Sequence, residues 1–171
     1  MIKKLVQGND EFVNQIYADA KLNGLIKDLS TNGQHPYALV ITCSDSRVIP
    51  ELIFNKTFGE LFVIRTAGNQ INDGELGTIE YAIEHLKIEH IIVLGHTHCG
   101  AVHAAMHNEK GKYLEPILSK IKLAIKDEKD EVKATNLNAD SVVRCIKSKF
   151  PIFKGEIIKA IYNIETGIVL I

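Results

Sequence analysis

Two short segments of the sequence contain the residue types that bind transition metals. Cys43 opens the segment CSDSR, and His96 and Cys99 lie in the segment GHTHCG. Two thiolates and one imidazole are a ligand set typical of catalytic zinc, because three protein ligands leave a fourth position for water. We therefore expect Cys43, His96 and Cys99 to hold one Zn²⁺ ion together. Gly95 and Gly100 are expected to let the backbone bend sharply around the last two ligands.

An aspartate and an arginine follow the first of these cysteines. Asp45 and Arg47 lie in the same segment as Cys43. An arginine within a few ångströms lowers the pKa of an aspartate, so Asp45 is expected to stay ionised and to act only as a hydrogen-bond acceptor. An acceptor beside a zinc-bound hydroxide would fix the orientation of that hydroxide. The alternative is an ion pair on a polar surface loop.

Length and composition exclude several classes of protein. The chain has 171 residues, with 20 Lys and Arg against 21 Asp and Glu, a net charge of −1. This predicts a single domain over residues 1–171 and argues against a nucleic-acid partner. Three cysteines are too few for a disulfide framework, and Cys145 is expected to be a small buried apolar residue. Because no apolar run approaches about 18 residues and the segment MIKKLVQGNDEF lacks the apolar centre of a signal peptide, we expect a soluble cytoplasmic protein without a membrane partner.

The elements that must position these residues follow from the apolar pattern. Continuous apolar runs rich in β-branched residues predict strands buried on both faces, as in a parallel sheet. Strands are expected at residues 38–42, 61–64, 91–94, 157–162 and 167–171. Helices are expected at residues 10–27, with a cap near Asn9 or Asp10, and at 74–88, 113–126 and 139–149. The sum is an α/β domain with a mostly parallel β-sheet flanked by helices, and sites in such sheets form at the carboxyl ends of the strands.

Taken together, the two metal-binding segments resemble those of the β-class carbonic anhydrases. The resemblance runs from about residue 34 to the end of the chain and includes GQHPYALVITCSDSRV, ELFVIRTAGN, GTIEYAIEHLKIEHIIVLGH and AIYNIETGIVLI, in the family order. It implies that Cys43, His96 and Cys99 are the zinc ligands. It also implies that Asp45 and Arg47 form the Asp-Arg dyad of the family.

The resemblance extends to residues of a substrate pocket. Gln34, nine residues before Cys43, and Tyr81, fifteen residues before His96, match positions that line the substrate pocket of the family. We place Gly100 in the same pocket. The alternatives are a solvated turn residue for Gln34 and a core aromatic side chain on a helix face for Tyr81.

The implied reaction is the reversible hydration of carbon dioxide to bicarbonate and a proton. Zinc lowers the pKa of bound water toward about 7, zinc-bound hydroxide attacks carbon dioxide, and the dyad orients the hydroxide. Two alternatives stay open: hydrolysis of carbonyl sulfide or carbon disulfide at the same zinc site, and a zinc-binding protein without turnover in which Asp45 closes the fourth position. The resemblance also implies a homodimer or a higher homo-oligomer, which would cover the apolar last strand, GIVLI.

Overall fold

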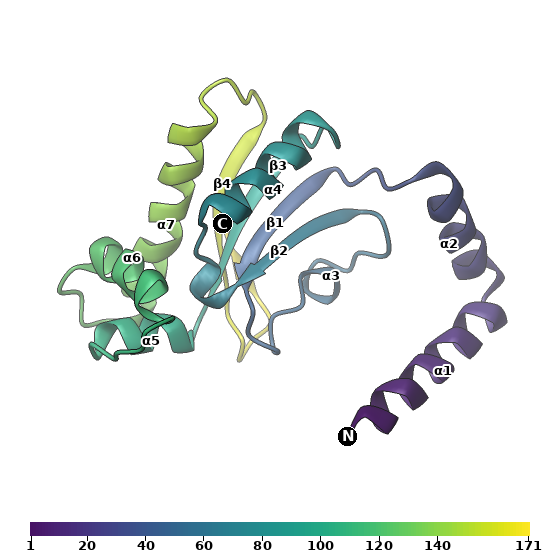
Figure 1. Ribbon diagram of the computed structural model, residues 1–171, viewed down its shortest axis with the longest axis horizontal. Coiled ribbons are helices and arrows are strands. Elements are labelled where there is room, and N and C mark those ends of the chain that lie inside the picture. The colour runs from purple at the N-terminus through teal and green to yellow at the C-terminus, as the bar shows by residue number, and fades with distance from the viewer. The chain divides into compact units, whose positions relative to one another are not determined.

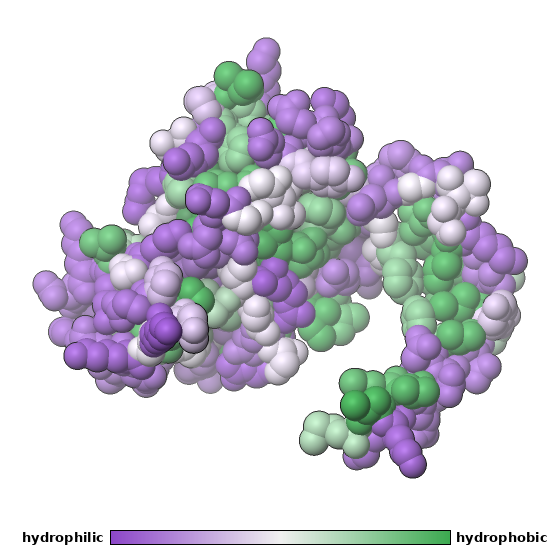
Figure 2. Space-filling model, in the orientation of Figure 1, coloured by the Kyte–Doolittle hydropathy of each residue, from purple (hydrophilic) through white to green (hydrophobic).

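A computed structural model describes residues 1–171 of the chain. The chain divides into two compact units, Met1–His35 and Pro36–Ile171, and each is described by itself. The first unit consists of α1 (Ile2–Ala18) and α2 (Ala20–Asn32), and neither helix contains a buried residue. Apolar side chains of both helices lie on the surface of this unit (Figure 2). None of the helices in the chain is both long and apolar enough to cross a membrane.

The break between the first two helices corrects a prediction. A single helix over residues 10–27 is wrong in its bounds, because helix begins earlier and is interrupted at Asp19 (Figure 1). Asp19 has extended backbone angles, and its side chain accepts hydrogen bonds from two backbone N–H groups of the following turn. Such a residue caps a helix and cannot continue one. The expected cap near Asn9 or Asp10 is also wrong, since both residues lie inside α1.

The second unit is built on a five-stranded sheet in the order β2-β1-β3-β4-β5 (Figure 1). Strands β1 to β4 pair in parallel, and β5 pairs antiparallel to β4. The mostly parallel sheet predicted from the sequence is therefore confirmed. The strands are β1 (Ala38–Cys43), β2 (Leu61–Thr66), β3 (His90–His96), β4 (Glu156–Tyr162) and β5 (Val169–Leu170).

Helices connect the strands, and local capping decides where two of them begin. A capping box between Asn72 and Glu75 opens α4. Asp130 accepts a hydrogen bond from the backbone N–H of Lys133 and opens α7, which therefore begins well before the predicted residue 139. The helical segments of this unit are α3 (Pro50–Ile53), η1 (Ala67–Asn69, a 3₁₀ turn), α4 (Asp73–Glu84), α5 (Gly100–Met106), α6 (Glu115–Ile125) and α7 (Glu131–Lys149).

The core lies on both faces of the sheet and continues beyond its carboxyl edge. Leu39 and Ile41 of β1 pack in a cluster with apolar side chains of α4 and α7. Val40, which points to the opposite face, packs in a second cluster to which α3 contributes. A third cluster contains Cys43 and Cys99 together with apolar side chains of α5, α6 and α7. The predicted metal ligands therefore lie where the sheet edge meets a packed, apolar group of helices.

Candidate metal centre

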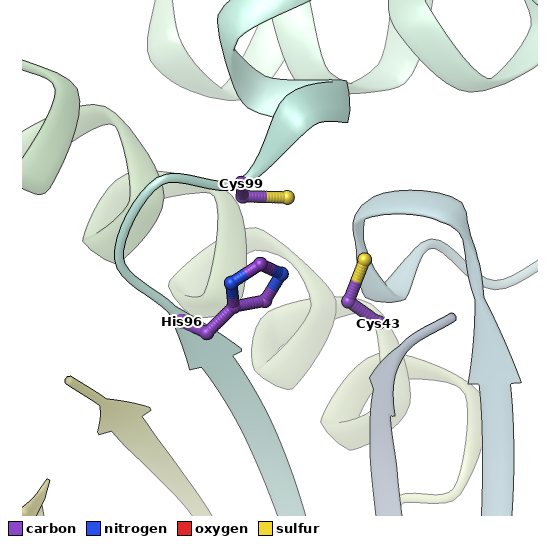
Figure 3. A group of neighbouring side chains, drawn as sticks. All are labelled: Cys43, His96 and Cys99. Atoms are coloured by element: carbon purple, nitrogen blue, oxygen red, sulfur yellow. The ribbon is translucent and has the colours of Figure 1, made fainter. Parts of the chain in front are cut away.

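Three side chains converge at the carboxyl edge of the sheet. Cys43 ends β1, His96 ends β3, and Cys99 is the residue before α5. Figure 3 shows their side chains pointing toward one another. All three are buried, and their ligand atoms lie within 4.8 Å of one another. Atoms that share one zinc ion at bond lengths of about 2.0 to 2.3 Å fall within this range. The structure thus brings together the three residues that the sequence predicts.

The imidazole of His96 is fixed in a form that can bind a metal. Its Nδ1 lies 2.9 Å from the carbonyl oxygen of Thr97. A carbonyl oxygen only accepts, so Nδ1 carries the proton and Nε2 is left with its lone pair. Nε2 is buried without a hydrogen-bond partner in the protein. A buried nitrogen lone pair beside two sulfur atoms is the donor set that zinc prefers, so these residues fit a zinc ion.

The two thiols differ in their readiness to ionise. Hydrogen bonding from Cys99 lowers the pKa of Cys43 to about 4 despite its burial. The Cys43 sulfur and burial raise the pKa of Cys99. Burial opposes the ionisation of His96, but its contact with Cys43 outweighs this and raises the pKa of the imidazole. Two thiolates this close repel each other, so holding both ionised requires a cation between them.

Asp45 and Arg47 form an ion pair, so the arginine lies as close to the aspartate as the sequence analysis expected. Arg47 Nη2 lies 2.7 Å from Asp45 Oδ2, while Arg47 Nε and the Arg47 backbone N–H both donate to Oδ1, at 2.9 and 3.0 Å. These bonds hold the pKa of Asp45 well below its usual range. Arg47 Nη2 also donates to the carbonyl oxygen of His98, at 3.3 Å. The pair thus links the loop after Cys43 to the loop between His96 and Cys99.

Arg65 has a role at this site that the sequence does not reveal. Arg65 lies near the carboxyl end of β2 and donates to two backbone carbonyl oxygens. Its Nη2 lies 2.7 Å from the carbonyl oxygen of Asp45, and its Nε lies 3.3 Å from that of Cys43. The pairing of β1 with β2 places Arg65 beside Thr42 and Thr66 beside Cys43. Strand pairing alone predicts that Arg65 lies near Cys43, but not which atoms its side chain contacts. Arg65 therefore fixes the backbone that carries Cys43 and Asp45.

The turn between His96 and Cys99 bends at a residue other than the two glycines. Gly95 lies inside β3 and Gly100 inside α5, so the prediction that they supply the bend is wrong. The left-handed backbone conformation falls on His98, with φ of 56°. Gly95 lies in a tightly packed place: a Cβ there would lie 2.9 Å from Ile161 Cδ1 in β4 and 3.3 Å from Thr135 Cγ2 in α7, so a larger residue would have to displace these side chains. Close packing against the neighbouring strand explains this glycine.

The predicted pocket residues are not all gathered at the cluster. Gly100 adjoins Cys99 and is exposed. Gln34 is exposed and belongs to the first unit. Tyr81 of α4 is half-exposed, stacks on the ring of His85 at 5.1 Å and packs 6.2 Å from that of Phe62. Phe62 pairs with a residue near the amino end of β1, so Tyr81 packs toward the strand ends opposite the ligands.

The structure defines an α/β protein with a Cys-His-Cys cluster, a candidate metal centre, at the carboxyl edge of a mostly parallel sheet and an Asp-Arg pair beside it. The sequence model of the carbonic anhydrase family matches residues 38–169. The chain therefore belongs to the carbonic anhydrase family, and its structural neighbours place it in the β-class. This confirms the resemblance noted from the sequence.

Solved structures of β-carbonic anhydrases share the fold over nearly the whole chain. The β-carbonic anhydrase CcaA is 31% identical, with a TM-score of 0.80, over 99% of this chain and 86% of that chain. The β-carbonic anhydrase CafA of Aspergillus fumigatus is 25% identical, with a TM-score of 0.83, over 99% of this chain and 89% of that chain.

Curated relatives are similar over shorter stretches. A carbonic anhydrase of Synechococcus elongatus is 48% identical over 107 residues, which are 59% of this chain and 38% of that protein. A carbonic anhydrase of Helicobacter pylori is 35% identical over 134 residues, which are 72% of this chain and 59% of that protein. The matched region thus spans less than two thirds of these relatives.

Proposed function

We propose that the protein catalyses the reversible hydration of carbon dioxide to bicarbonate and a proton, with Zn²⁺ held by Cys43, His96 and Cys99. The observation that carries this proposal is the convergence of three buried ligand atoms, one of them an imidazole nitrogen without a partner in the protein. When bound, zinc acts as a Lewis acid that lowers the pKa of a coordinated water molecule from about 16 to about 7. Membership of the carbonic anhydrase family supports the same reaction.

Asp45 orients the attacking oxygen in this proposal. Because Arg47 keeps its carboxylate ionised, Asp45 can only accept hydrogen bonds. An oxygen nucleophile beside it must direct its proton toward the carboxylate, which leaves a lone pair free for the carbon of carbon dioxide. Arg47 occupies both carboxylate oxygens and so fixes the plane of the acceptor.

The position of Asp45 also supports turnover over a closed, inactive site. The carboxylate is not part of the group of ligand atoms that lie within 4.8 Å of one another, which consists of Cys43, His96 and Cys99. A zinc ion held by these three residues would keep one coordination position for solvent, whereas a fourth protein ligand would fill it. The pairing of Asp45 with Arg47 offsets the negative charge that would otherwise draw the carboxylate to a cation.

Stopped-flow measurement of carbon dioxide hydration tests the proposed activity. Protein of known zinc content is expected to raise the hydration rate above the buffer rate, to lose this activity after chelation and to regain it when zinc is added. Carbonyl sulfide and carbon disulfide are measured with the same preparation. Hydrolysis of either compound without hydration of carbon dioxide would contradict the proposal, and so would zinc-loaded protein that leaves all three substrates unchanged.

We propose in addition that the chain forms a homodimer or a higher homo-oligomer. No residue of α1 or α2 is buried, and Ile2, Leu5 and Val6 on α1 are each more than half exposed. Leu170 of the edge strand β5 is exposed as well. Uncovered apolar surface of this kind is typical of interaction sites. Two β-carbonic anhydrases of Sordaria macrospora with this fold are described as tetrameric.

Light scattering after gel filtration tests the oligomeric state. The expected mass is a multiple of the 19.0 kDa chain. Leu5→Glu is expected to shift the mass toward that of the single chain, while Lys3→Glu on the same helix is the matched control. A single-chain mass for the unmodified protein would contradict the proposal. The assignment of Gln34, Tyr81 and Gly100 to the substrate pocket stays a prediction.

A further inference from the structure

The sulfur of Cys43 receives a hydrogen bond from the backbone of the loop after β2. The N–H group of Gly68, in η1, lies 3.4 Å from Cys43 Sγ. Gly68 has φ of 63°, and a Cβ at this position would lie 2.9 Å from Ile121 Cδ1 and 3.0 Å from Ala101 Cβ. Only glycine combines this backbone conformation with so close an approach. The position and angle of this donor therefore depend on what holds Gly68 in place.

A buried amide on α7 holds Gly68 from the other side. Asn138 Nδ2 donates to the carbonyl oxygen of Gly68, at 2.9 Å, and Asn138 Oδ1 accepts from Gln70 Nε2, at 2.6 Å. Asn138 is fully buried, and Gln70 is 4% exposed. Thr66 Oγ1 donates to the carbonyl oxygen of Gln70, at 2.6 Å, and so closes the same loop. Asn138 is thus fixed by one side chain and in turn fixes the residue that donates to the sulfur.

Burying the polar side chain of Asn138 costs free energy that burying an apolar side chain would not cost. Burying an amide is unfavourable unless its hydrogen bonds are satisfied, and both partners of Asn138 belong to the loop at residues 66–70. A hydrogen bond to a ligating sulfur changes how strongly that sulfur donates to a metal. The chain of contacts from Asn138 through Gly68 to Cys43 therefore gives this amide a route to the metal centre.

We propose that Asn138 is a positioning residue for the metal centre. It holds the Gly68 N–H against the Cys43 sulfur, and this hydrogen bond raises the affinity of the centre for its metal and affects the bond between the sulfur and the metal. The proposal rests on the proposed binding of zinc by Cys43, His96 and Cys99. Its effect passes through Gly68, since the Asn138 side chain forms its hydrogen bonds with that residue and with Gln70.

Metal binding by Asn138→Ala, beside a matched control, tests this role. Thr135→Val is the control, because Thr135 lies one turn away on α7, is also buried and has a hydroxyl without a hydrogen-bond partner. Zinc affinity is measured by competition with a chelator, and the sulfur-to-metal charge-transfer band is recorded with Co²⁺ in place of zinc. We expect Asn138→Ala to lose about 10-fold to 100-fold in zinc affinity and to shift the band, while Thr135→Val keeps both at their original values.

Several outcomes would overturn the proposal. Folded Asn138→Ala with unchanged zinc affinity and an unchanged band would do so, and so would an equal loss in Thr135→Val, which would point to packing of α7 in general. If Asn138→Ala does not fold, Gln70→Met removes the amide that orients Asn138 and is expected to show a smaller loss in the same direction. No change in Gln70→Met would then refute the role. Failure of the unmodified protein to bind either metal would instead refute the zinc site itself.

Discussion

Replacing Asp45 by asparagine tests the proposed division of work at the site. The substitution keeps the size of the side chain but replaces one acceptor oxygen by an NH₂ group. With the remaining oxygen kept on the two donors that reach Oδ1, the new NH₂ group faces Arg47 Nη2 across the 2.7 Å that now separates Nη2 from Oδ2. Two donors then oppose each other, and the site loses an acceptor that is charged and fixed in orientation.

We expect Asp45→Asn to lose turnover but to keep its zinc. Removing a single preorganised polar group from an active site costs about 10²-fold to 10³-fold in turnover, or about 3 to 4 kcal/mol of transition-state stabilisation. Asp45 lies outside the group of ligand atoms, so zinc content is expected to stay at one equivalent. Stopped-flow hydration and metal analysis on the same preparation measure both quantities.

A second aspartate provides the control. Asp140 of α7 pairs with Lys159 at 3.1 Å, outside the metal centre, and Asp140→Asn makes the same chemical change there. It is expected to keep the original rate and zinc content. Undiminished turnover by zinc-loaded Asp45→Asn would refute the orienting role. Loss of zinc from Asp45→Asn would show that the carboxylate is itself a ligand.

Three further outcomes follow from the structure. Cys43→Ala is expected to lose zinc and activity together while Cys145→Ala retains both, and metal analysis that finds zinc retained in Cys43→Ala would contradict the ligand assignment. Gly95→Ala is expected to destabilise the fold by about 1 to 3 kcal/mol, because its Cβ would overlap a side chain of β4; an unchanged denaturant midpoint would count against this packing argument. Arg47 lowers the pKa of Asp45, so the native state binds fewer protons than the unfolded state. The stability that this pair contributes is therefore present above about pH 4, the pKa of an unfolded aspartate, and is lost as the pH falls through the pKa of Asp45 in the native state. Urea unfolding of metal-free protein should therefore show a gap between the original chain and Asp45→Asn at neutral pH that narrows in acid, and a gap independent of pH would refute the linkage.

The sheet was predictable because its signals are local. Runs such as residues 38–42 are apolar and β-branched throughout, and the strand at β1 adds only Cys43 to this range. The first helices were harder, since one side chain, Asp19, decides between a continuous helix and two helices through its capping bonds. The periodicity of apolar residues cannot reveal such a break, because apolar residues continue at helical spacing on both sides of it.

The Cys-His-Cys cluster and the Asp45–Arg47 ion pair were predictable, while the residues that hold them in place were not. Residue type and position at strand ends identify Cys43, His96 and Cys99 as candidate ligands. Arg65 and Asn138 act through hydrogen bonds to backbone atoms, the second over a separation of 70 residues in the chain. The sequence carries no signal for such contacts, because any buried amide or strand-end arginine would look the same. They become visible only when the loops are placed in space.

X-ray absorption at the zinc edge tests the central claim most directly, using protein produced with zinc supplied. The arrangement of Cys43, His96 and Cys99 predicts one zinc per chain, with two sulfur atoms at about 2.3 Å and two lighter atoms at about 2.0 to 2.1 Å. A folded protein that carries no zinc, or a zinc ion without sulfur neighbours, would contradict it.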